Sequence, residues 1–320
     1  IISQHFFRKT PTNFVMGYFY VYLDYFYPKG GTGALKNLLE QKVLEWDGNI
    51  VLNKKIVNVI PSKSMVVDSE GGSYPYDHLI WAADLKTFYR SLNPVGLEAK
   101  TIRKIDSETK RVLSSKGAES VIILHLAVNR PPSYFRENSG EHLFFTPSKQ
   151  GLGVTNGEER LRLLENFDQI SRTEVMLWLE KYCDLNTYEV SIPVLRDNTL
   201  APAGQTGLMI SCLFDYHILR KIEQAGWYDE FKEIVENRIV KIFSQTIFKD
   251  IDQDILFKFL STPLTIQKIS GSSDGAITGW SFEIEPPVIY NLLDIPKSVL
   301  TPISNIYQAG QWAYAPAGVP

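Results

Sequence analysis

The stretch that decides the fold covers residues 27–84, which open with YPKGG at 27–31 and close with DHLIWAAD at 77–84. Directly after YPKGG, residues 34–46 carry apolar side chains at offsets of 0, 3, 4, 8 and 11. Because an α-helix has about 3.6 residues per turn, this spacing places them in one stripe. We therefore expect a helix with one buried side that ends at Gly48. Its stripe consists of Leu35, Leu38, Leu39, Val43 and Trp46.

Three further patterns in this stretch indicate strands. Residues 49–60 (NIVLNKKIVNVI) are rich in branched side chains and long enough to cross a sheet. Residues 65–68, followed by the glycine-containing turn 70–72, predict a hairpin. Residues 78–83 are almost wholly apolar and end in small residues, as expected for a strand buried on both faces. This order of elements is typical of an open α/β nucleotide-binding sheet, where a small-residue exit lets a ligand approach the backbone.

Three segments carry a resemblance to a known family. The first comprises YPKGG, the strand LNKKIVNVI at 52–60 and IWAAD at 80–84. The second is VLRDNTLAPAGQTGLMISCLFDY at 194–216, and the third is YQAGQWAYAPAGVP at 307–320. In order and spacing they resemble the phytoene desaturase, carotenoid isomerase and retinol saturase family of FAD-dependent oxidoreductases, within the flavin amine oxidoreductase superfamily. The resemblance covers nearly the whole chain.

The resemblance implies an α/β fold with two domains. Residues 28–84 and 301–320 would form a partial Rossmann-like FAD-binding domain. Residues 1–27 and 85–300 would form an α+β substrate-binding domain with a mixed sheet. FAD is the implied cofactor, and a lipophilic polyene of the carotenoid or retinoid kind is the implied substrate. Such families hold the dinucleotide pyrophosphate on a GxGxxG turn, and none occurs here, so we expect a fragment that is inactive by itself.

On the same resemblance, eight residues contact the cofactor. The strand around Val57 places backbone groups against the adenine, and Ala82 and Ala83 lie beside the diphosphate. Gly310 and Gln311 stand where the family has a Gly-Asp pair that holds the ribityl chain, and glutamine keeps the hydrogen-bonding capacity without the charge. The last three begin a helix whose N-terminus would face the flavin ring: Gly318, Val319 and Pro320. Small residues at a strand end also suit close helix packing without a ligand, and this alternative stays open.

The composition is that of an ordinary globular protein. With 44% hydrophobic residues, 22% charged residues and a net charge of −3, the chain is not expected to have a nucleic-acid partner. Its two cysteines, Cys183 and Cys212, predict buried side chains in a reducing, cytoplasmic compartment. The sequence contains no run of 18 apolar residues, so no membrane-spanning helix is predicted. The aromatic cluster at 14–26 suits a core, a lipophilic pocket or a membrane interface, so peripheral membrane contact stays open. The sequence does not indicate the oligomeric state.

The rest of the chain predicts the substrate side. The continuous apolar run at 120–129 predicts a central strand of a second sheet, with further strands at 190–195 and 208–214. Residues 227–248 predict a long amphipathic helix with a solvated, charged face. His125 lies in the first of these strands and is expected to be a hydrogen-bonded core residue rather than a catalyst.

No catalytic acid, base or nucleophile stands out. We predict neither a metal site nor Ser-His hydrolysis, because the histidines lack partners at ligand or triad spacing: His5, His78, His125, His142 and His217. Flavin chemistry suits such a chain, since the cofactor takes the hydride and the protein supplies position and electrostatics. The first hypothesis is therefore an FAD-dependent oxidoreductase that desaturates, saturates or isomerises a lipophilic polyene. Two alternatives stay open: a flavin amine oxidase-like enzyme, and a non-catalytic ligand-binding protein that has kept the fold.

Overall fold

A computed structural model describes residues 26–115, 117, 119–150, 158–281 and 292–313. The chain divides into two compact units. The first unit comprises Ile1–Asp47 and Glu119–Thr265, and the second comprises Gly48–Ala118 and Ile266–Pro320.

The bounds of the units differ from the expected domain bounds. Residues 28–47 belong to the first unit, whereas residues 85–118 and 266–300 belong to the second. The assignment of one domain to FAD and of the other to the substrate stays a prediction.

The second unit contains two small sheets. Strands β1 (Ile56–Ile60), β2 (Met65–Asp68) and β3 (Ser73–Pro75) form an antiparallel sheet in this order, which confirms the expected hairpin. Strand β4 (Leu79–Trp81) pairs in parallel with β10 (Ile306–Gln308), so the segment that follows the hairpin is joined to the end of the described chain.

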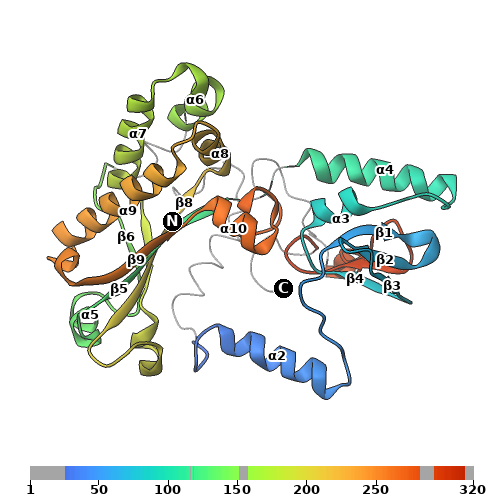
Figure 1. Cartoon of the computed structure of the whole chain (residues 1–320), viewed down its shortest axis with the longest axis horizontal. Coiled ribbons are helices and arrows are strands. Elements are labelled where there is room, and N and C mark those ends of the chain that lie inside the picture. The colour runs from blue at the N-terminus through green and yellow to red at the C-terminus, as the bar shows by residue number, and fades with distance from the viewer. Residues whose placement is uncertain (1–25, 116, 118, 151–157, 282–291, 314–320) are drawn as a thin grey trace. The chain divides into compact units, whose positions relative to one another are not determined.

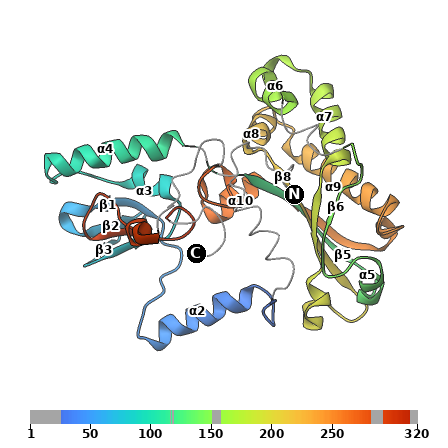
Figure 2. The ribbon, with the colours of Figure 1, turned by 180° about the vertical axis from the view of Figure 1, so that it is seen from behind.

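Helices complete the second unit. Helix α3 (Leu85–Ser91) lies between α4 (Ala99–Ser114) and β1 (Figure 2). Its buried side chains, Leu85 and Phe88 among them, join Val59 of β1 and Trp81 of β4 in one apolar core. The short 3-10 helices of this unit are η2 (Pro61–Lys63), η7 (Ser273–Gly275) and η8 (Leu292–Lys297).

Two expectations for this region are wrong. The strand expected over 49–60 is formed only by β1, because Asn53 has a left-handed backbone (φ 59°) that a strand does not accommodate. Strand β4 is not buried on both faces, since Ile80 is 65% exposed. Among the described residues β4 pairs only with β10, which leaves much of its surface uncovered.

The first unit is built on a five-stranded sheet, and its strand order places β5 between two neighbours, as expected for a central strand. All four pairings between these strands are antiparallel, so the mixed sheet expected for this domain is wrong. The order is β6 (His142–Phe145), β7 (Tyr188–Ser191), β8 (Thr206–Phe214), β5 (Ser120–Val128) and β9 (Ile255–Ser261).

One face of this sheet carries the core of the first unit. Along β5 and β8 every second residue is buried, as the two-residue period of a strand dictates. Helices α7 (Arg172–Leu185) and α9 (Tyr228–Gln245) cover this face (Figure 1), and α9 confirms the long helix expected there. The other elements are α5 (Pro132–Asn138), α6 (Glu158–Asn166), α8 (Tyr216–Gln224), η3 (Phe167–Gln169), η4 (Pro193–Leu195), η5 (Asn198–Leu200) and η6 (Ile251–Asp254).

Helix α2 (Gly33–Glu45) also belongs to the first unit by sequence range, and its existence confirms the predicted helix. The prediction that one side of this helix is buried is wrong, because none of its residues is buried. The predicted stripe is exposed by 40% to 78%, and no described segment covers it. Periodicity identifies apolar positions, but it does not supply the surface against which they pack. Helix α10 (Pro263–Ser270) crosses the sequence boundary between the two units.

Single residues of the first unit also match their expected roles. Cys183 and Cys212 are buried and free, and burial raises the pKa of the Cys183 thiol to about 12. The ring of His125 stacks on Phe259 with 4.3 Å between centroids, and its Nε2 lies 3.2 Å from Ser261 Oγ. His125 is thus hydrogen-bonded, as expected, but it lies on the less buried face of the sheet rather than in the core.

Candidate cofactor-binding site

Asp84, which follows Ala82 and Ala83 after the end of β4, fixes the path of the chain at this point. Asp84 is the N-cap of α3, and its Oδ1 accepts hydrogen bonds from Thr87 N at 2.8 Å and Thr87 Oγ1 at 3.0 Å. Aspartate is favoured at this position because its carboxylate satisfies backbone donors of the first helical turn. The indole Nε1 of Trp81 donates to the carbonyl oxygen of Asp84 at 3.0 Å. The exposed pair Ala82 and Ala83 is therefore held between two anchored residues.

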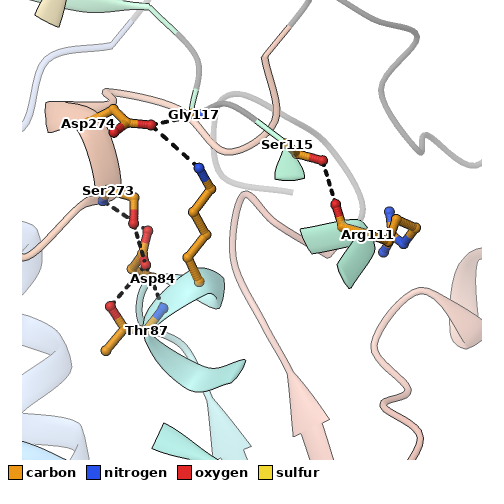
Figure 3. Close-up of polar contacts among 8 residues, drawn as sticks. Asp84, Thr87, Arg111, Ser115, Gly117, Ser273 and Asp274 are labelled. Atoms are coloured by element: carbon orange, nitrogen blue, oxygen red, sulfur yellow. Dashed lines mark hydrogen bonds and ion pairs between the residues drawn. The ribbon is translucent and has the colours of Figure 1, made fainter. Parts of the chain in front are cut away.

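The same carboxylate also binds a segment that is distant in sequence. Asp84 Oδ2 accepts from Ser273 N at 3.0 Å, and Oδ1 accepts from Ser273 Oγ at 2.9 Å. Figure 3 shows Asp84 turned toward both Thr87 and Ser273. Four donors thus converge on one carboxylate, which joins the end of β4 to the loop after α10.

A second polar contact lies beside the first. Lys86 is only 5% exposed, and its Nζ lies 3.4 Å from Asp274 Oδ2. The same oxygen accepts from Gly117 N at 3.3 Å (Figure 3). A Cβ atom at Gly117 would stand 2.9 Å from the carbonyl oxygen of Ser273, so the close approach of these segments requires glycine.

A groove of about 1110 Å³ opens next to these contacts. Apolar residues of β1, β2 and β4 line part of it, and Ala82 and Ala83 form another part with little more than backbone and methyl groups. Its lining includes three lysines and one carboxylate, that of Asp84, so the groove has a positive excess. The full lining is Asn53, Lys54, Lys55, Ile56, Val66, Leu79, Ile80, Trp81, Ala82, Ala83, Asp84, Thr87, Gln267, Lys268, Ile269, Ser270 and Gly271.

The border of the groove holds a charged cluster around Asp68. This carboxylate accepts from Tyr74 Oη at 2.8 Å, Gly72 N at 2.8 Å and Glu70 N at 2.9 Å. The hydrogen bond from Tyr74 is the main reason why the pKa of Asp68 lies below its ordinary value, and Lys54 adds to the effect against the opposing influence of burial. In turn, the ion pair with Glu70 raises the pKa of Lys54.

The structure brings only part of the expected cofactor residues to this groove. Ala82 and Ala83 line it, whereas Val57 is 45% exposed on β1 and does not. Gly310 and Gln311 lie outside the lining as well. The three residues of the expected last helix fall outside the described residues: Gly318, Val319 and Pro320.

Gly310 and Gln311 instead belong to a tight backbone contact. Gly310 has a left-handed backbone (φ 87°), which suits glycine. A Cβ atom at Gly279 would stand 2.4 Å from the carbonyl oxygen of Gln311, so the segments around these two residues touch through their backbones. Trp280 Nε1 donates to the carbonyl oxygen of Trp312 at 3.0 Å, and the two rings lie 4.9 Å apart edge to face.

Several residues of the groove were missed by sequence reasoning. The adjacent pair Lys54 and Lys55 stands directly before β1 and offered a signal, because two cations precede a strand expected near a dinucleotide. Residues 267–271 offered none, since their place in the groove depends on the distant contact between Asp84 and Ser273. In the part of the chain that the structure describes, no three His, Cys, Asp or Glu side chains gather to hold a metal ion.

In the first unit, the YPKGG motif at 27–31 meets the family-like segment at 194–216. The Pro28–Gly31 turn closes with a hydrogen bond from Gly31 N to the carbonyl oxygen of Pro28 at 3.0 Å. The N–H of Gly30, at its tip, donates to the carboxylate of Asp197 from the DNTLAPAG segment. These motifs are thus in direct contact within one unit, which their separation in sequence did not reveal.

Comparison with known proteins agrees with these features. No family model matches the chain. The chain is similar to a phytoene desaturase (lycopene-forming) of Pseudescherichia vulneris, at 22% identity over 305 residues, which cover 92% of this chain and 53% of that protein. It is also similar to a 4,4'-diapophytoene desaturase (4,4'-diaponeurosporene-forming) of Staphylococcus aureus strain Newman, at 26% identity over 136 residues, 41% of this chain and 25% of that protein. The chain thus spans about half the length of the first relative.

Solved structures agree in fold. An oxidoreductase from Methanosarcina mazei superimposes with a TM-score of 0.55 at 13% identity, over 91% of this chain and 51% of that one. Putrescine oxidase bound to putrescine gives a TM-score of 0.50 at 12% identity, over 90% and 49% of the two chains. The likeness to the desaturases supports an FAD-dependent oxidoreductase superfamily, and the solved structures show a shared fold. They confirm the α/β fold class and the resemblance seen in the sequence, and FAD is the cofactor of this superfamily.

Proposed function

We propose that this chain serves an FAD-dependent oxidoreductase that desaturates, saturates or isomerises a lipophilic polyene. The observation that carries the proposal is the likeness to a phytoene desaturase over 92% of the chain, which includes both structural units. The second relative, named for diapophytoene, points to the same class of substrate.

The groove of the second unit fits part of the cofactor. Its volume of about 1110 Å³ is enough for a large part of a dinucleotide, and its excess of lysines suits a ligand that carries phosphates. Its wall at Ala82 and Ala83 lets a ligand come close to the backbone, as their proposed place beside the diphosphate requires. When bound, FAD would supply the chemistry by taking a hydride from the substrate or returning one.

The roles of the chain's own residues are binding and orientation. Asp84 holds the exit of β4 and the loop at Ser273 in a fixed relation, and so preserves the shape of the groove in the second unit. Val57, Gly310 and Gln311 remain proposed cofactor residues by resemblance, together with Gly318, Val319 and Pro320. No residue is assigned as a catalytic acid or base.

No helix of the described residues is long and apolar enough to cross a bilayer. We also propose peripheral contact with a membrane, from which a lipophilic substrate would be drawn.

The test uses the longest native form of the protein, purified without added cofactor. We expect a flavin absorbance band and conversion of a carotenoid-type polyene in detergent or lipid. Amines such as putrescine serve as the comparison substrates. A protein that neither contains flavin nor takes up FAD would refute the proposal, and oxidation of amines without conversion of polyenes would replace it with the amine oxidase alternative.

A further inference from the structure

The lysines of the groove differ in how their charges are balanced. Lys54 lies 3.5 Å from Asp68 Oδ2 and also pairs with Glu70, so its charge is compensated. Lys55 and Lys268 line the same groove, and neither has a carboxylate within 4.0 Å among the described residues. Two exposed cations from separate segments of one unit therefore remain available to a ligand.

The carboxylate of Asp84 offsets only one of these two charges. Its two oxygens accept four hydrogen bonds, two from Thr87 and two from Ser273, so its lone pairs are directed to protein donors. A carboxylate bonded in this way presents few free acceptor sites to the groove. With Lys54 compensated, Lys55 and Lys268 outnumber the one carboxylate of the lining, so the groove favours an anion.

The walls of the groove set the kind of anion. Ile56, Val66 and Leu79 give it an apolar part, whereas the lysines give it a polar part. A small inorganic anion would leave most of the 1110 Å³ unfilled. A nucleotide combines a flat, largely apolar base with a charged phosphate group and therefore matches both parts.

We propose that this groove binds the phosphate group of a dinucleotide through Lys55 and Lys268. Lysine suits this task because its ammonium is a compact point charge with three donors, able to follow a flexible diphosphate. The inference rests on the proposed function for the identity of the dinucleotide as FAD. The same chemistry would hold a nicotinamide dinucleotide that delivers or removes electrons, and the experiment separates the two.

The first experiment uses the 320-residue chain and measures its melting temperature with millimolar pyrophosphate, ADP or riboflavin at low salt. We expect pyrophosphate and ADP to raise the melting temperature and riboflavin, which has no phosphate, to leave it unchanged. Lys55→Gln and Lys268→Gln should each weaken ADP binding by about fivefold, near the upper range for an exposed ion pair. Lys100→Gln is the matched control, since Lys100 is an exposed lysine on α4 of the same unit, outside the groove.

Binding should also weaken as salt rises, because exposed charges are screened. Absence of any effect of ADP, or equal binding by the double variant K55Q/K268Q and the natural chain, would overturn the inference. A loss in K100Q as large as in K55Q would overturn it too, since it would show that general surface charge is responsible.

The second experiment identifies the dinucleotide in the longest native form. If K55Q/K268Q lowers FAD affinity and leaves that for NADPH unchanged, the site holds the flavin, and the reverse result assigns it to the nicotinamide dinucleotide. Flavin content that is normal and insensitive to both substitutions would refute the inference but not the proposed function. Lysine-dependent ADP binding in a protein that never takes up flavin would refute the proposed function but support phosphate binding in the groove.

Discussion

The carboxylate Oδ2 of Asp197 accepts a hydrogen bond from the backbone N–H of Gly30 at 2.6 Å, across 167 residues of sequence. Asp197 is only 8% exposed, and its Oδ1 accepts from Thr199 N at 3.0 Å and Thr199 Oγ1 at 2.7 Å. Gly30 has a left-handed backbone (φ 87°) at the tip of its turn, which turns its N–H outward to the carboxylate. One buried side chain therefore fixes the turn that leads into α2.

Removal of this carboxylate should loosen the turn without abolishing the fold. Asp197→Ala leaves the N–H groups of Gly30 and Thr199 without their acceptor, so we expect the melting temperature of the first unit to fall by a few degrees. Asp197→Asn keeps one oxygen and should lose less. Calorimetry measures both, with Asn198→Ala as the matched control at the next position. Equal stability of the alanine variant and the natural chain would show that the contact contributes nothing.

The same contact predicts a dependence on pH. The Gly30 N–H, followed by the donors of Thr199 and the charge of Lys29, holds the pKa of Asp197 below its ordinary value. Because the folded pKa is lower than the unfolded one, which is about 3.9, the stabilisation is complete above that pH. It is lost as the pH falls through the folded pKa. The difference in melting temperature between the natural chain and Asp197→Asn should thus be larger at about pH 7 than at about pH 3, and a constant difference would contradict this linkage.

The ion pair of Lys86 and Asp274 predicts a large effect from a single substitution. Lys86 is 5% exposed, so Asp274→Ala would leave a buried ammonium without its carboxylate. Such a loss costs about 3 kcal/mol of unfolding free energy. Replacement of both residues, Lys86→Met with Asp274→Ala, removes the charge as well and should recover much of the loss. Urea unfolding of the two single variants and the double variant measures the coupling, and strictly additive losses would refute it.

Two glycines offer a direct test of backbone packing. At Gly279 a Cβ atom would stand 2.4 Å from the carbonyl oxygen of Gln311, and backbone cannot move aside as a flexible side chain can. We expect Gly279→Ala to lower the unfolding free energy by about 1–3 kcal/mol. At Gly33, near the start of α2, a Cβ atom would have no neighbour within 4 Å, so Gly33→Ala should be neutral or stabilising. Equal effects of the two substitutions on the unfolding free energy, measured with urea, would contradict the requirement for glycine at position 279.

The sequence predicted elements well where one strand or helix carries its own signal. The apolar runs that became β5 and β8, and the helical stripe of α9, could be read directly from the sequence. The same reasoning failed for α2, whose stripe is exposed, and for Ile80 of β4. An apolar pattern shows that a residue suits a core, but a covering surface must come from elsewhere in the chain.

Contacts across long separations explain most of what the sequence could not predict about the site. Asp84 is the N-cap of α3, a role that only the structure revealed. Its bonds to Ser273, 189 residues away, had no local signal, and they bring residues 267–271 into the groove. Ala82 and Ala83 were identified through resemblance, whereas Lys55 and Lys268 were found only once the groove was known.

The last prediction concerns FAD and the chain as it stands. No GxGxxG sequence occurs in these 320 residues, so the groove offers phosphate contacts without the turn that such enzymes use to bind a diphosphate tightly. If affinity is in the millimolar range, about 10 μM FAD shifts the unfolding free energy by far less than about 0.1 kcal/mol. We therefore expect micromolar FAD to leave the melting temperature unchanged, while millimolar ADP raises it. A clear rise with micromolar FAD would show that this chain alone holds a complete flavin site.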